Sequence, residues 1–259
     1  MSGRKPRWKI LALSLVAALA LAAVAVARPP IETSVGNLVL TFGFGSSPEA
    51  LPAHENVPIK FWGSLRIGTK DGTIPAKIEH VDVEIDKFGD VETHGLPACS
   101  KAKLSTTTTQ QARQLCPGAI VGTGSGKGIL AFPEQPPIDV TTPLTFFNGP
   151  HFGADPSVIV HAHLNIPAPT TYLVLLRVER IQNGIYGFRI ASDVPRIAGG
   201  SGTITGFRFR IDREWKYKGK EMHYLVARCP IGRLQAILNA SFDDGTQVQT
   251  HFVDACTRR

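Results

Sequence analysis

Residues 233–253 read RLQAILNASFDDGTQVQTHFV, and this stretch predicts a β-hairpin. Apolar and polar residues alternate on both sides of the loop Asp243-Asp244-Gly245, which is the pattern of strands with one buried face. A three-residue loop places Ala240 opposite Val248 on that face, and it puts Gly245 where a left-handed backbone is needed. The stretch therefore predicts two antiparallel strands in a defined register.

A shorter loop gives a poorer pairing. A two-residue loop at Asp244-Gly245 would place Phe242 opposite Gln247, so that an apolar side chain would face a polar one. The three-residue loop also brings Ala236 opposite Phe252, which keeps the apolar residues of both strands on one face. We therefore expect the longer loop.

The same register bears on the four cysteines. It continues to Gly232 opposite Cys256, which leaves Cys229 three residues away, and the other close pair in the sequence is Cys99 and Cys116. We expect the bridges Cys99–Cys116 and Cys229–Cys256, out of the three pairings that four cysteines allow. Each would stabilise the fold by roughly 2–4 kcal/mol. A zinc site is disfavoured, because the spacings contain no C-x-x-C.

Alternation with period two recurs throughout the chain after residue 27, and turn pairs such as Asn183-Gly184 separate the segments. This pattern favours an all-β, disulfide-stapled, antiparallel β-sandwich of about ten or more strands, with one short helix at 107–115. We expect a single domain over 28–259, or two sub-domains that divide near residue 150. The expected strands are 37–44, 59–67, 78–85, 157–166, 172–181, 185–190, 203–211, 222–229, 233–242 and 246–253.

Residues 1–27 have the three parts of a secretory signal peptide. Four basic residues lie within 1–9, an apolar run covers 10–27, and the run ends in Ala-Val-Ala. We expect cleavage after Ala27 and a secreted, extracellular product; an uncleaved segment would instead anchor the chain at the cell surface. Four of the seven net positive charges lie in 1–9, which leaves three for the rest and argues against a nucleic-acid partner.

Two sets of polar residues share a strand face. His161 and His163 are two residues apart in an apolar strand, as a metal-binding pair requires, and they are the candidate metal ligands. His80, Asp82 and Glu84 could form an acid–base or hard-metal cluster. We interpret both sets as exposed polar strand faces, because no third ligand can be placed beside the histidines.

The stretch 122–128, GTGSGKG, has some likeness to a phosphate-binding loop but lacks the G-x-x-x-x-G-K-[ST] spacing. We expect a flexible loop between strands there. Trp62, on an outward face with Lys60 and Arg66, and Trp215 are candidate exposed aromatics of the kind that stack on sugars or peptides. Partial burial under a loop is the more frequent alternative for such residues.

Five short motifs occur in order along the chain: Gly95-Leu96-Pro97-x-Cys99, Cys116-x-x-Ala119-x-Val121-Gly122, Phe147-Asn148-Gly149, Tyr224-x-x-Ala227-Arg228-Cys229-Pro230 and Asp244-Gly245-Thr246. Together they span most of residues 36–256. This set resembles an uncharacterised family of secreted proteins from soil actinobacteria. The resemblance implies export and disulfide bonds, and it brings no known activity and no catalytic residues.

These observations favour a non-enzymatic module for binding or for cell-envelope structure. The alternative is a secreted hydrolase that acts on cell-wall or environmental polymers, because a β-sandwich can gather active-site residues from distant strands. We expect no cofactor and assign no catalytic residue. The expected partner is a cell-envelope polymer or another secreted protein, and a membrane only if the signal segment is retained.

Overall fold

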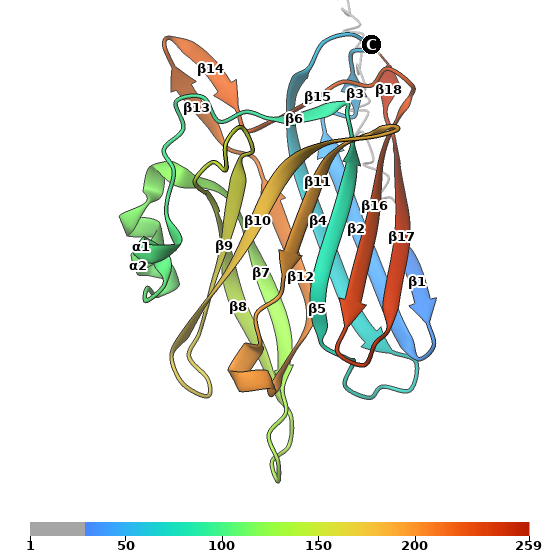
Figure 1. Ribbon diagram of the computed structural model, residues 1–259, viewed down its shortest axis with the longest axis vertical. Coiled ribbons are helices and arrows are strands. Elements are labelled where there is room, and N and C mark those ends of the chain that lie inside the picture. The colour runs from blue at the N-terminus through green and yellow to red at the C-terminus, as the bar shows by residue number, and fades with distance from the viewer. Residues whose placement is uncertain (1–28, 259) are drawn as a thin grey trace, which may run out of the picture.

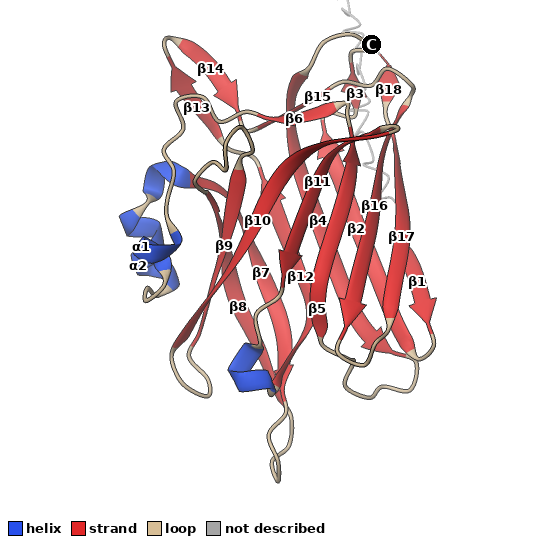
Figure 2. Ribbon diagram, in the orientation of Figure 1, coloured by secondary structure: helices blue, strands red, loops and turns tan. Residues whose placement is uncertain are grey.

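The computed structural model of the protein describes residues 29–258 (Figure 1). The predicted signal peptide, residues 1–27, lies outside the described residues. Most of residues 29–258 form antiparallel strands, with two short α-helices on one side (Figure 2). None of the helices in this described range has the length and the apolar character needed to cross a membrane.

One long path of strands builds the main sheet. Each neighbour on the path is antiparallel to the next. The order is β1 (Ile31–Val35), β2 (Leu38–Ser47), β4 (Val57–Thr69), β12 (Gly202–Ile211), β7 (Ile120–Leu130), β8 (Ile138–Asn148), β9 (Ser157–Leu164), β10 (Thr170–Asn183), β11 (Tyr186–Asp193), β5 (Ile78–Asp86), β16 (Arg233–Phe242) and β17 (Gln247–Ala255).

Six short strands lie at one end of the long strands (Figure 1). Strand β15 (Leu225–Ala227) pairs with β4 and with β6 (Gly89–Val91). Strands β13 (Glu214–Tyr217) and β14 (Lys220–His223) form a separate hairpin, and β3 (Ala50–Leu51) pairs in parallel with β18 (Thr257–Arg258). The predicted strand 222–229 is therefore divided between β14 and β15.

The sheet curls until its two ends meet. Strand β1 lies beside β17, where Thr250 Oγ1 donates a hydrogen bond to Thr33 Oγ1 over 2.9 Å. The result is a nearly closed, barrel-like sheet, with β2, β4 and β12 behind β5, β11 and β16 in Figure 1. The all-β antiparallel fold is confirmed. The sandwich is not confirmed, because the strands of both walls belong to one continuous path.

The hairpin of β16 and β17 has the predicted register. Ala240 pairs with Val248 and Ala236 pairs with Phe252. The loop backbone closes through Gly245, which has φ of +84°, and its N–H donates to Phe242 O over 3.0 Å. The three-residue loop is therefore confirmed, and it sets the inward face of the hairpin against β2 and β4.

Two apolar clusters fill the space between the walls. One joins β2, β4, β5, β16 and β17, and the other joins β7, β8 and β12 with the segments above them. Phe209 packs against the second cluster. Its ring centroid lies 5.5 Å from that of Phe146, 5.9 Å from that of Phe61 and 6.1 Å from that of Phe207. These aromatic contacts are worth about 0.5–1.5 kcal/mol each beyond the burial of their area.

The flexible loop predicted at 122–128 is wrong, because these residues lie within β7. Their alternate glycines face inward against β12. A Cβ at Gly122 would lie 2.3 Å from Arg210 O, and one at Gly124 would lie 2.3 Å from Arg208 O. Glycine is therefore required by the close approach of strand β12, where a side chain would separate the two strands.

Helices α1 (Lys101–Leu104) and α2 (Thr109–Leu115) cover the outer surface of β8 and β9 (Figure 2). Thr108 begins α2 with a capping box, since the Thr108 side chain accepts from Gln111 N–H and the Gln111 side chain accepts from Thr108 N–H. The predicted helix at 107–115 is thus confirmed as α2, whereas the single turn of α1 was not predicted. Leu104 of α1 and Ala112 of α2 are fully buried, in one cluster with Phe147 and Ile159 of the sheet.

Both predicted disulfides are present. Cys99–Cys116 joins the start of α1 to the end of α2, and Cys229–Cys256 joins the segment before β16 to the segment after β17. Cys229 is buried with Leu51 and Ala227 in a small cluster of its own. The second bridge therefore holds the base of the last hairpin, as its register predicts.

We expect the double variant Cys229→Ala, Cys256→Ala to lose about 2–4 kcal/mol in free energy of unfolding, because the bridge closes a long loop across the hairpin. Urea unfolding followed by tryptophan fluorescence measures this loss. In the matched variant without Cys99–Cys116, hydrogen exchange should accelerate in α2 while the strands stay protected. An unchanged unfolding midpoint in the first variant would contradict this role.

Candidate functional site

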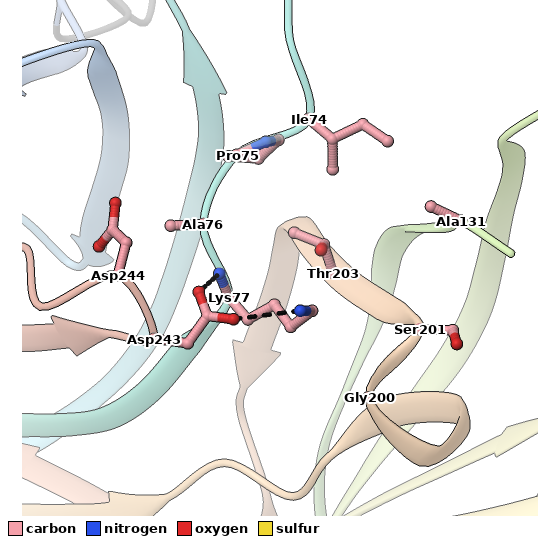
Figure 3. A pocket seen from close by; sticks show the side chains of 10 residues that line it. All are labelled: Ile74, Pro75, Ala76, Lys77, Ala131, Gly200, Ser201, Thr203, Asp243 and Asp244. Atoms are coloured by element: carbon pink, nitrogen blue, oxygen red, sulfur yellow. Dashed lines mark hydrogen bonds and ion pairs between the residues drawn. The ribbon is translucent and has the colours of Figure 1, made fainter. Parts of the chain in front are cut away.

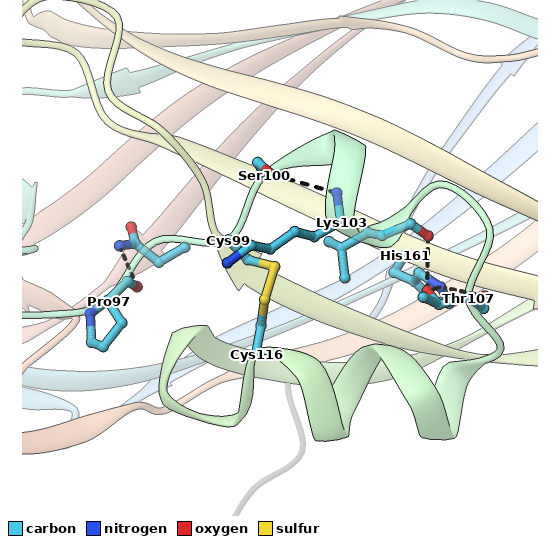
Figure 4. The surroundings of a disulfide bond; sticks show 9 residues. Pro97, Cys99, Ser100, Lys103, Thr107, Cys116 and His161 are labelled. Carbon is cyan, nitrogen blue, oxygen red and sulfur yellow. Dashed lines mark hydrogen bonds between the residues drawn. A yellow bond between two sulfur atoms is a disulfide. The ribbon is translucent and has the colours of Figure 1, made fainter.

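The two candidate metal ligands lie beneath the helices. His161 and His163 project from the outer face of β9, but His161 is fully buried because α1, α2 and the loop between them cover it (Figure 4). The exposed polar face predicted for this pair is therefore wrong for His161. In the range 29–258, no group of three or more His, Cys, Asp or Glu residues is placed to hold a metal ion.

Hydrogen bonds give these histidines a role in holding the loop between α1 and α2. His161 Nε2 lies 3.0 Å from Thr107 O and 3.1 Å from Thr107 Oγ1. Thr171 Oγ1 donates to Thr107 O over 2.7 Å, and it therefore accepts from His163 Nδ1 over 3.0 Å. The loop carbonyl thus receives two hydrogen bonds from the sheet, while His161 Nδ1 is buried and has no hydrogen-bond partner among residues 29–258.

The acid–base cluster that is the alternative for His80, Asp82 and Glu84 does not assemble on β5. His80, Asp82 and Glu84 share the outer face, as expected, but Glu84 is buried there, and all three side chains contact residues of β11. His80 Nδ1 lies 2.7 Å from Asp193, whereas Asp82 and Glu84 both pair with Arg189. The contact with Arg189 lowers the pKa of the Glu84 carboxyl, so this group is held as an anion.

The other wall carries an exposed tryptophan. Trp62 lies on the outer face of β4, and 42% of its surface is exposed. Its cross-strand neighbours are Gly45 on β2 and Arg210 on β12, and the same row continues to Thr123 on β7. We call the outer surface of these four strands the tryptophan face.

The indole of Trp62 lies against the backbone of Gly45. A Cβ added to Gly45 would be only 2.4 Å from Trp62 Cζ2, so any other residue there would push the ring away. Gly45 is itself buried by this contact. The ring therefore rests on the sheet with part of its surface in solvent, which suits it to stack against a flat ligand.

Basic side chains surround Trp62. Arg210 pairs with Asp212 over 2.7 Å and Lys60 pairs with Glu214 over 3.0 Å. Lys60 also lowers the pKa of the Glu214 carboxyl by hydrogen bonding and by its charge. These pairs fix two cations beside the ring.

Further along the strands, the tryptophan face carries three more cations. Arg208 Nε donates to Ser125 Oγ over 3.0 Å, and Arg66 and Lys127 are exposed on the neighbouring strands. None of the three takes part in an ion pair within the described part of the chain. The tryptophan face is therefore positively charged away from its paired end.

A shallow hollow of about 230 Å³ lies at the paired end of the tryptophan face. Thr123, Asp212 and Glu214 line it together with Arg213 and residues 120–122. It therefore borders the row that contains Trp62. The Arg213 guanidinium donates to Gly118 O over 3.4 Å, and its Nε is buried without a hydrogen-bond partner.

A second hollow, of about 360 Å³, lies at the other end of the barrel-like sheet (Figure 3). It lies between the loop before β5, the loop of the last hairpin and the start of β12. Lys77 crosses its edge and bonds to Asp243, with its N–H 2.8 Å from Oδ1 and its Nζ 3.1 Å from Oδ2. Lys77 and Asp243 are paired with each other, and the Asp244 carboxylate accepts from Thr246 N–H over 2.9 Å.

Trp215, the other candidate aromatic, has a structural role. Its Nε1–H donates to His94 O over 3.0 Å, and the ring packs on the apolar cluster of β7, β8 and β12. It is thus partly buried under a loop, the alternative expected for such residues. The sequence did identify Trp62 as a candidate binding residue, with Lys60 and Arg66 on the same face. It did not mark Arg208, Arg210 or the hollow as parts of that site.

Burial lowers the pKa of the His161 imidazole below its usual value of 6.5, and the charges of His163 and Arg113 act in the same direction. The unfolded chain therefore binds a proton near pH 6.5 that the folded chain resists. We expect the free energy of unfolding to be highest above that pH and to fall as the pH drops toward the lowered pKa.

Urea unfolding of the variant His161→Gln at pH 7 and pH 5 tests this expectation. The glutamine amide can still donate to Thr107 O but does not titrate, so the difference between the two pH values should shrink. The exposed His251→Gln variant serves as the control. A pH dependence identical to that of the wild type in His161→Gln would contradict the role of this buried ring.

No family model, no curated protein and no solved structure matches this chain. Its own residues therefore provide the evidence for function. Of the surfaces described above, the tryptophan face combines an exposed aromatic ring, hydrogen-bonding groups and a hollow in one place. The histidine cluster and the outer face of β5 are already occupied by contacts within the chain.

Proposed function

We propose that this protein is a non-catalytic module that binds polysaccharide outside the cytoplasm, on the tryptophan face. The observation that carries the proposal is the position of Trp62, which lies on Gly45 with 42% of its surface exposed. A sugar ring presents C–H groups on one face and hydroxyls around its edge. An exposed indole surrounded by polar side chains is complementary to both parts.

The surroundings of Trp62 supply donors and acceptors for hydroxyl groups. Ser64 and Arg208 lie in the next row of the sheet, and Asp212 and Glu214 line the hollow beyond Arg210. Successive rows on one face are about 6.6 Å apart. A ligand longer than one sugar is therefore needed to touch both the ring and the second row.

The shape of the face favours a polymer over a small molecule. Pockets for small molecules usually enclose their ligand in about 300–1,000 Å³. The hollow beside Trp62 holds only about 230 Å³ and is open to the rest of the face. A chain lying across the strands would gain contact from the whole surface, whereas a free monosaccharide would gain little.

The covalent structure fits work outside the cytoplasm. Both disulfides join residues in buried positions, and such bridges persist in oxidising compartments. Cell-envelope or environmental polysaccharide is the polymer available in such a setting. The proposal therefore extends the expectation of a secreted binding module and specifies the surface that binds.

A secreted hydrolase is the second candidate, because two carboxyl groups, Asp212 and Glu214, line one hollow. Glycoside hydrolysis needs one carboxyl whose pKa is raised, so that it donates a proton to the leaving group. Lys60 instead lowers the pKa of Glu214, and Arg210 pairs with Asp212. These contacts favour hydrogen bonding to a bound sugar over acid catalysis.

We expect Trp62→Ala to weaken binding to an insoluble polysaccharide by at least about tenfold, which corresponds to about 1.4 kcal/mol. The measurement is depletion of the protein from solution by a panel of insoluble polysaccharides, with release of reducing sugar assayed in the same tubes. The binding proposal predicts depletion without release.

Phe152→Ala is the matched control, because Phe152 is 40% exposed but lies on the loop between β8 and β9, away from Trp62. It should bind like the wild type. If the wild type releases sugar and Glu214→Gln stops this release, the hydrolase is correct. If no polysaccharide in the panel depletes the protein, or if Trp62→Ala binds normally, the proposed face is wrong.

A further inference from the structure

We propose that the polymer held on the tryptophan face is an acidic polysaccharide, whose carboxylates pair with Arg66, Arg208 and Lys127. This inference rests on the proposed function and adds the chemical class of the ligand. It follows from the arrangement of charge on the two walls of the sheet.

The three cations lie along a track that leads away from Trp62. Arg208 is one row beyond Trp62, beside Ser64, and Arg66 and Lys127 are in the next row on either side of Gly206. Residues four apart on one strand are separated by about 13 Å. The track therefore has room for a short stretch of polymer with several acidic groups.

The opposite wall shows what a neutralised surface looks like in this chain. There Arg189 bonds to Asp82 and Glu84, and Arg177 bonds to Asp155 and Glu179. Arg189 takes both of its anions from the neighbouring strand β5, whereas Arg177 takes one from its own strand and one from the loop before β9. The cations of the track have none within the described part of the chain, so an external anion is the partner that would complete them.

The hollow at the other end of the face offers one more cationic donor. Arg213 lines the hollow, and its Nε is buried without a hydrogen-bond partner. Because Asp212 and Glu214 also line the hollow, this donor is placed to bind a sugar hydroxyl, and the carboxylates of the polymer lie along the track of Arg66, Arg208 and Lys127.

The distribution of acids argues against nucleic acid as the ligand. Asp212 and Glu214 lie in the hollow, and Glu32 and Asp139 lie at the margins of the face on β1 and β8. Duplex DNA carries a charge for about every 1.7 Å of its axis, so it would meet these acids as well as the cations. A polymer with one carboxylate per sugar can place its charges at the cations alone.

The test compares two soluble polymers with the same backbone: polygalacturonate, and its methyl-esterified form, in which the carboxylates are neutral. Isothermal titration gives the affinity of the purified protein for each, at low and at high salt. We expect polygalacturonate to bind at least about tenfold more tightly than its methyl-esterified form. High salt should weaken the binding of polygalacturonate more than that of the esterified form. Arg208→Gln and Arg66→Gln should each remove most of this preference.

Arg233→Gln is the matched control, since it removes one exposed positive charge from β16 on the opposite wall. Equal binding of both polymers, with Trp62→Ala still defective, would overturn this inference and leave the proposed function intact. If the protein binds neither polymer, this inference is wrong. If the insoluble panel also fails to deplete the protein, the proposed function is wrong as well. A DNA oligonucleotide that binds as tightly as polygalacturonate would show a general polyanion surface and overturn the assignment to a polysaccharide.

Discussion

The packing of Phe209 against its neighbours on the inside of the sheet determines what lies outside. Because side chains alternate along a strand, Phe207, Phe209 and Ile211 can face inward only if Arg208 and Arg210 face outward. The inward glycines of β7 make room for this packing, since β12 approaches them too closely for a Cβ. A slip of one residue would bury two guanidinium groups and expose the aromatic rings. The positive charge of the tryptophan face is therefore a consequence of how the core is packed.

Helices α1 and α2 help to position the hollow at the end of the tryptophan face. Cys99–Cys116 ties α1 to the end of α2, and the chain then passes directly through Pro117–Ala119 into β7. Gly118 in this short turn accepts the hydrogen bond from Arg213, and Ile120 lines the hollow. His161 and Thr171 hold the loop before α2 against the sheet. The features that stabilise the cover thus also position one wall of the hollow.

The sequence predicts those parts of the fold that depend on neighbouring residues. The hairpin register and both disulfides follow from alternation and spacing, and α2 is expected as a short helix. Strands β7 and β8 are not predicted, because inward glycines and Pro143 remove the apolar signal that marks a strand. The burial of His161 could not be predicted either, since it results from helices that fold back over β9 from fifty residues earlier in the chain. Likewise, alternation along β4 predicts that Trp62 faces outward, but it does not predict which residues of β2 and β12 lie beside the ring.

The net charge of the whole chain is a poor guide to its ligand, because it does not show which charges pair between distant strands. Outside the first nine residues the excess of positive charge is only three, which by itself indicates no anionic partner. Ligands respond to local charge, however, and local charge depends on which cations have found anions within the fold. On the wall of β5, β10 and β11, Arg189 and Arg177 pair with carboxylates, whereas on the wall of β4, β7 and β12 the cross-strand neighbours of Arg66 and Arg208 are glycine and serine. Ion pairing within the described part of the fold therefore neutralises the arginines of one wall and leaves Arg66 and Arg208 of the other without anions, and this difference is the basis of the proposed binding of an acidic polymer on the tryptophan face.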